Sequence, residues 1–111
     1  MSSRTSEWTA TAKERRALDE QLYTLVGRSV KEVRVTRVNW PKGYRWVTTF
    51  FGTNGREVPV FDRGLHHQAA VILREVFPRA SWGRAQDYEV ATGTLREHVV
   101  RLPSALREAK H

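Results

Sequence analysis

The stretch SVKEVRVTRVNWPKGYRWVTTFFGTNGREVPVF, residues 29–61, decides the fold of this 111-residue chain. It contains three segments rich in β-branched and aromatic residues, over 30–40, 44–51 and 56–61. Turn-forming residues separate these segments, Pro41-Lys42-Gly43 first and Asn54-Gly55 second. The pattern predicts an antiparallel meander of three strands.

The lengths of the two turns predict which residues face each other across the sheet. We expect a three-residue loop at 41–43, with Trp40 opposite Tyr44, and a two-residue loop at 54–55, with Thr53 opposite Arg56. One face then carries Val33, Val35, Val47, Thr49, Phe51 and Val58, with Arg37, Asn39 and Arg45 at its far end. The other carries Val38, Trp40, Tyr44, Trp46, Phe50 and Phe61. Such a sheet is either covered on both faces or offers an aromatic surface to a partner.

The residues before the meander predict one helix. Thr11 and Glu14 have the spacing of a capping box, and leucines then recur at helical spacing up to a glycine that fits a C-terminal cap. We expect a helix over 12–26. Residues 1–10 are polar, and we predict a flexible N-terminal segment there, followed by one domain over 11–111.

The residues after the meander predict further elements. Asp62 is a good N-cap for a helix that ends at Phe77, before a proline. Residues 87–91 alternate like a short fourth strand, and Thr94 and Glu97 have the spacing of a second capping box at the start of a C-terminal helix. The predicted fold class is α+β, a single domain with an antiparallel meander sheet of three to four strands packed by two to three helices, in the order α-β-β-β-α-(β)-α.

The order of helix, three-stranded meander and helix over 12–77 is similar to the layout of double-stranded RNA-binding domains. Its later part is similar to DNA-binding domains that read DNA with a three-stranded sheet and a helix. Both resemblances concern the order of elements alone. No residue role and no family membership is taken from them.

Positive charge gathers on the first predicted hairpin. The chain has 19 Lys and Arg against 12 Asp and Glu, a net charge of +7. Residues 1–27 are balanced in charge, whereas residues 28–46 carry six basic residues against Glu32 alone. Guanidinium groups bind phosphates and guanine edges, and aromatic rings stack on bases. Because both residue types are interleaved here, the sequence predicts nucleic-acid binding.

The predicted nucleic-acid contacts come from the hairpin and from the outer face of the second helix: Arg34, Arg37, Asn39, Lys42, Arg45, Arg63, His67 and Arg74. Three aromatic residues are predicted to stack on bases or to dock a partner, namely Trp40, Tyr44 and Trp46. The expected function is that of a small DNA-binding accessory or regulatory factor, with DNA favoured over RNA as the partner.

Two other functions remain open. An aromatic sheet face would also suit a protein-interaction or dimerisation module, with a homodimer or another protein as the partner. A hydrolase or nuclease would use His66, His67 or His98 as a general base. The adjacent His66 and His67 point about 100° apart on a helix, so they cannot chelate one metal as an i, i+4 pair does.

The sequence predicts no cofactor, no metal site and no membrane partner. It lacks cysteine, and no apolar run approaches the roughly 20 residues that a membrane span needs. The first residues do not form the apolar core of a signal peptide. We therefore expect a cytoplasmic protein.

Overall fold

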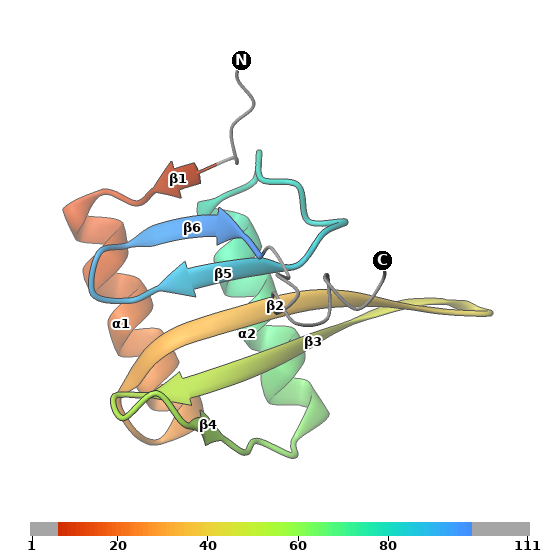
Figure 1. The fold of residues 1–111 in the computed structure, drawn as a ribbon, viewed down its shortest axis with the longest axis horizontal. Coiled ribbons are helices and arrows are strands. Elements are labelled where there is room, and N and C mark those ends of the chain that lie inside the picture. The colour runs from red at the N-terminus through yellow and green to blue at the C-terminus, as the bar shows by residue number, and fades with distance from the viewer. Residues whose placement is uncertain (1–6, 99–111) are drawn as a thin grey trace, which may run out of the picture.

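The described residues, 7–98, form an α+β fold in this computed structural model, with one antiparallel sheet covered on one face by two helices (Figure 1). The elements in chain order are β1 (Glu7–Thr9), α1 (Ala12–Val26), β2 (Val30–Trp40), β3 (Gly43–Gly52), β4 (Glu57–Val58), α2 (Arg63–Val76), β5 (Gln86–Glu89) and β6 (Thr94–Glu97). Across the sheet the strand order is β1-β6-β5-β2-β3-β4. The predicted fold class is confirmed, but this sheet has six strands instead of three or four.

The two additional strands lie at the ends of the described chain. The predicted flexible segment does not extend to Glu7–Thr9, because β1 pairs with β6. Thr94–Glu97 form β6 and do not begin a helix, so that part of the prediction is wrong. Leu95 of β6 is fully buried between its neighbours Trp8 and Tyr88, and this nonlocal burial outweighs the local capping pattern. The rest of the predicted C-terminal helix, at 99–111, lies outside the described residues.

Both helices begin at the side chains that predicted them. The Thr11 hydroxyl accepts a hydrogen bond from the Glu14 amide at 3.1 Å, and the Glu14 carboxylate accepts one from the Thr11 amide at 2.9 Å. This capping box satisfies two amides that the first helical turn leaves free. At the start of α2, the Asp62 carboxylate accepts a hydrogen bond from the Gly64 amide at 2.8 Å. Neither described helix is long and apolar enough to cross a membrane.

The core lies between the helices and the sheet. Its most deeply buried apolar residues come from both layers and are Leu18, Leu22, Val33, Val35, Phe50, Ala69, Ala70, Leu73, Tyr88 and Leu95. The opposite face of the sheet, the charged face, carries ion pairs. There Arg34 donates to the Asp87 carboxylate at 2.7 Å, and Arg96 donates to Glu7 at 2.6 Å. Val47 and Phe51 of β3 also lie on this face, so among the described residues it is mixed in polarity, whereas the face covered by the helices is apolar.

The two turn lengths are the reverse of those predicted. Trp40 pairs with Gly43, so the first loop has two residues, whereas Gly52 donates to the Arg56 carbonyl at 2.9 Å and encloses a three-residue loop. In the second loop the Asn54 side chain accepts a hydrogen bond from the Arg56 amide at 2.9 Å, and Gly55 has φ 80°. An Asx turn followed by a left-handed glycine stabilises this longer connection.

The reversed turn lengths shift the pairing between β2 and β3 by one residue. Val33 faces Phe50 and Val35 faces Thr48, so Val47, Thr49 and Phe51 point to the charged face. A one-residue shift moves a whole set of side chains to the other face of a strand. The predicted grouping of Arg37, Asn39 and Arg45 on one face is therefore wrong. Arg37 and Asn39 face the helix side, and Arg45 faces the opposite side.

Candidate nucleic-acid interface

The ends of β2 and β3 form a two-stranded arm, residues 37–46, that projects beyond the rest of the sheet (Figure 1). From the Arg37–Trp46 pair to the Trp40–Gly43 pair the arm is about 10 Å long, at roughly 3.3 Å per residue. Two of its aromatic side chains are open to solvent, with Trp40 52% and Tyr44 56% exposed. These rings are available to a ligand.

Each face of the arm carries one arginine stacked on one ring. The Arg37 guanidinium lies over the Tyr44 ring, 4.8 Å from its centroid. On the other face the Arg45 guanidinium lies over Trp40 at 5.1 Å. Cation–π contact of this kind holds a long side chain in one direction while its N–H groups stay accessible. The arm therefore presents oriented guanidinium groups on both faces.

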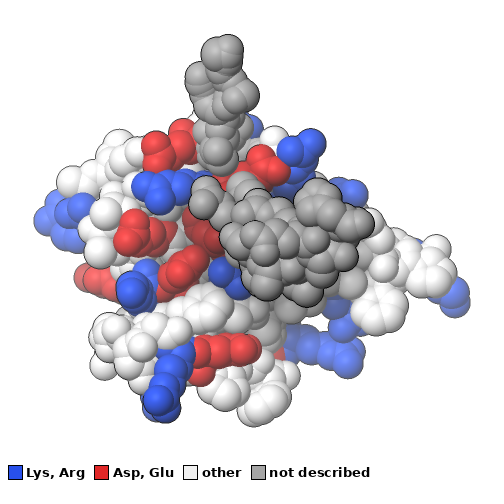
Figure 2. All heavy atoms as spheres, in the orientation of Figure 1, with Lys and Arg blue, Asp and Glu red and all other residues white. Residues whose placement is uncertain are grey.

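The charge of the arm is entirely positive. No Asp or Glu occurs between Val33 and Arg56, and Lys42 occupies the turn at the tip. Carboxylates gather instead over the part of the sheet formed by β1, β6 and β5, while the projecting hairpin shows only Lys and Arg among its charged residues (Figure 2). An anionic ligand is therefore attracted to the arm and its base.

One edge of β3 has no neighbouring strand at the base of the arm. β4 is two residues long and pairs only with Phe50 and Phe51. The Thr48 amide points away from β2, since it donates to His66 Nδ1 at 3.0 Å. In an antiparallel ladder every second residue points the same way, so the backbone groups of Tyr44 and Trp46 also point outward. Within residues 7–98 no strand pairs with them.

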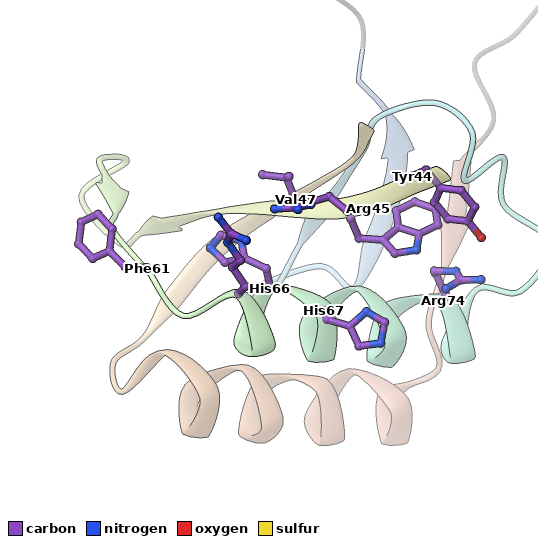
Figure 3. A pocket seen from close by; sticks show the side chains of 9 residues that line it. Tyr44, Arg45, Val47, Phe61, His66, His67 and Arg74 are labelled. Atoms are coloured by element: carbon purple, nitrogen blue, oxygen red, sulfur yellow. The ribbon is translucent and has the colours of Figure 1, made fainter. Parts of the chain in front are cut away.

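A groove of about 520 Å³ lies between this edge and α2. Its lining residues are Tyr44, Arg45, Trp46, Val47, Phe61, Arg63, His66, His67 and Arg74. Phe61 lies at one end of the groove, and Tyr44 and Arg74 lie at the other (Figure 3). The lining thus combines aromatic residues with three arginines and contains no carboxylate.

Trp46 forms the base of the groove and belongs to the packed structure. It is 9% exposed, contacts Tyr44 and Trp82 edge to face, and lies under the Arg74 guanidinium at 4.7 Å. The predicted outer face of α2 is partly wrong, because Arg74 faces β3 and its guanidinium lies over Trp46. His66, Ala70 and Arg74 lie one turn apart on the side of α2 that faces β3.

His66 fastens the β4–α2 connection to β3. Its Nδ1 accepts from the Thr48 amide and lies 2.8 Å from the Thr48 hydroxyl, and its Nε2–H donates to the Val60 carbonyl at 2.6 Å. Both ring nitrogens are therefore used in holding the groove together. His67 lines the groove, whereas His98 is paired with Asp87 at 2.8 Å on the charged sheet face. Residues 7–98 contain no group of three potential metal ligands among His, Cys, Asp and Glu.

The structure brings most of the predicted contact residues together. Six of them lie on the arm, namely Arg37, Asn39, Trp40, Lys42, Tyr44 and Arg45, and four line the groove beside it, namely Trp46, Arg63, His67 and Arg74. Arg34 lies apart from both, in its ion pair with Asp87. Sequence reasoning did not place Phe61 beside these residues, because an apolar residue just before an N-cap looks like the end of a strand.

Comparisons of the chain with protein-family models, with curated proteins and with solved structures give no match. The arrangement can nevertheless be described chemically. It joins a cationic ribbon, with rings on both faces, to a cationic groove with aromatic walls. Phosphates and bases are the ligand groups that such a surface complements.

Proposed function

We propose that this protein binds nucleic acid through the arm, with duplex DNA as the favoured ligand. The observation that carries the proposal is a projecting two-stranded ribbon with cationic side chains on both faces and no carboxylate. The major groove of B-DNA is about 12 Å wide and about 8.5 Å deep and admits a ribbon of two strands. The arm, about 10 Å long, matches that depth.

The roles of the side chains follow from their positions. Lys42 at the tip enters first, and Arg37 and Arg45 reach the phosphates or base edges on the two sides of the ribbon. Their guanidinium groups are already oriented by the rings beneath them, so less side-chain freedom is lost on binding. We further propose an accessory or regulatory role in the cytosol, a compartment that the absence of cysteine favours.

The test is titration of labelled duplex DNA with the Arg37→Ala/Arg45→Ala variant at several salt concentrations. Each lost phosphate contact lowers the slope of log affinity against log salt by about 0.9. We expect the slope to fall by about one to two units and the affinity to fall by roughly tenfold or more, with the urea unfolding midpoint preserved.

The matched control is Arg16→Ala/Arg28→Ala. Both residues are exposed, Arg16 on α1 and Arg28 in the connection between α1 and β2, and the net charge changes by the same amount. This control should retain most of the parent affinity and slope. The arm is not the binding site if the arm variant binds DNA as tightly as the parent at low salt. The same conclusion follows if the arm variant and the control lose the same amount of affinity.

A protein-interaction module is the second candidate function, favoured by the open β3 edge. Tyr44 and Trp46 present backbone groups there that a strand from another chain could pair with. The partner would be another protein or a second copy of this chain. Binding led by apolar contact depends little on salt, and dimerisation raises the mass measured by sedimentation with increasing concentration. Binding to a protein partner that depends little on salt, or a mass that rises with concentration, would favour this candidate if the protein also fails to bind DNA.

A further inference from the structure

Phe61 is a large apolar residue that lies outside both the core and the arm. Its side chain is 91% exposed, the highest value among the large apolar residues within 7–98. Burying a phenylalanine ring stabilises a fold, and Phe61 does not make this contribution. A ring so placed offers both of its faces to a ligand.

The backbone on either side of Phe61 is fixed. The carbonyl of Val60 accepts a 2.6 Å hydrogen bond from His66, and Asp62 caps α2. The backbone therefore places the Phe61 ring at one end of the groove, with the exposed Tyr44 ring at the other (Figure 3). Two open rings at the ends of a defined groove suit a ligand with more than one flat group.

The charged residues that line the groove are all basic and favour an anionic ligand. Arg45, Arg63 and Arg74 line the groove, and no lining residue carries a negative charge. The backbone groups of Trp46 point into the same space, where one N–H and one C=O can bind the polar edge of a base. The volume of about 520 Å³ lies in the range of about 300 to 1,000 Å³ that small organic ligands fill.

We infer that the groove between β3 and α2 binds an unpaired segment of nucleic acid next to the duplex held by the arm. The inference rests on the proposed function and deepens it. Bases inside a duplex hide their faces in stacking, so Phe61 and Tyr44 contact only bases that have lost their partners. The arm and the groove share Tyr44 and Arg45, which places the junction of duplex and single strand at the base of the arm.

The experiment compares a blunt duplex with the same duplex carrying a short single-stranded overhang, in both polarities, by fluorescence anisotropy. The overhang should tighten binding by about tenfold in one polarity, in line with one to two stacked bases. Phe61→Ala and Arg63→Ala should each remove most of the gain from the overhang. Phe61→Ala should also keep the affinity for the blunt duplex within about twofold of the parent value. Phe61 makes no core contact to lose, so the urea unfolding midpoint should not change.

Matched controls are available on α1. Tyr23→Ala removes an exposed ring, 54% accessible, and Arg16→Ala removes an exposed guanidinium, both outside the groove. Both controls should keep the gain from the overhang. Poly-glutamate at equal charge concentration should displace the overhang poorly. Efficient displacement would overturn the inference, since it would show that the groove binds charge without reading bases.

The outcomes separate this inference from the proposed function. Equal affinity for blunt and overhanging DNA overturns the groove inference and leaves the arm proposal standing. A gain that survives both Phe61→Ala and Arg63→Ala overturns the assignment of the unpaired segment to this groove. Failure of the parent protein to bind even the blunt duplex at low salt overturns the proposed function, and the inference with it.

Discussion

Tyr88 offers the sharpest test of the core. Its ring lies at the centre of the sheet and is fully buried, and its hydroxyl has no hydrogen-bond partner among the described residues. Burial disfavours the charged phenolate and raises the pKa of Tyr88 from 10.0 to about 12. Replacing Tyr88 by Phe removes this group and keeps the ring.

The size of the effect follows from the pKa difference between the folded and unfolded chains. Two pKa units correspond to about 3 kcal/mol, at 1.36 kcal/mol for each unit. The unfolded chain loses the Tyr88 proton first, so the folded state holds more protons between about pH 10 and about pH 12. The stabilising contribution is therefore complete below pH 10 and is lost as the pH rises to about 12.

The assay is urea unfolding of the parent and of Tyr88→Phe near neutral pH, at about pH 10 and at about pH 12. Near neutral pH the variant should be as stable as the parent or more stable by about 1 kcal/mol, because a buried hydroxyl without a partner carries a desolvation penalty. Above pH 10 the parent should lose up to about 3 kcal/mol relative to the variant. The difference in ultraviolet absorbance between the two proteins follows the ionisation of Tyr88 alone.

Two results would refute this reasoning. A Tyr88 ionisation near pH 10 in the folded protein would mean that its hydroxyl is hydrated. A loss of about 1 kcal/mol or more in Tyr88→Phe near neutral pH would mean that the hydroxyl makes a stabilising hydrogen bond.

Two further predictions concern the base of the arm. Trp46→Ala should lower the free energy of unfolding in urea by about 3 to 5 kcal/mol, because the ring is buried against Trp82 and Arg74. A loss below about 1 kcal/mol would contradict the packing role of Trp46. His66→Ala should lower the free energy of unfolding by about 2 to 3 kcal/mol, since the Thr48 amide and the Val60 carbonyl lose their partner. His67 is exposed, so His67→Ala should change this free energy by less than about 0.5 kcal/mol. Equal melting temperatures for the two histidine variants would rule out the fastening role.

Local signals in the sequence were sufficient for both helices. Thr11 and Asp62 act on amides two or three residues away, so the residues that start each helix also identify it. The positions of the β2–β3 hairpin and of its basic residues were equally readable, because charge and turn residues are local properties. These parts of the prediction required no knowledge of contacts between distant segments.

The register and the sheet edges depend on contacts between distant segments. Adjacent phenylalanines at Phe50 and Phe51 give no indication of which one faces the core, and a turn one residue shorter exchanges them. β1 and β6 have three and four residues, and they are recognisable only through pairing, of β1 with β6 and of β6 with β1 and β5. The groove likewise needs His66 to reach Thr48, a contact that no local pattern reveals.

The pairing of β1 with β6 also sets an order of assembly. Trp8 faces Leu95, almost the whole described chain away, so β1 has no strand partner until β6 has left the ribosome. Contacts between distant parts of a chain form slowly, because a long loop must close first. α1, the β2–β3 hairpin and α2 can pack together before that step. We therefore expect β1 to be the last of the described strands to join the sheet.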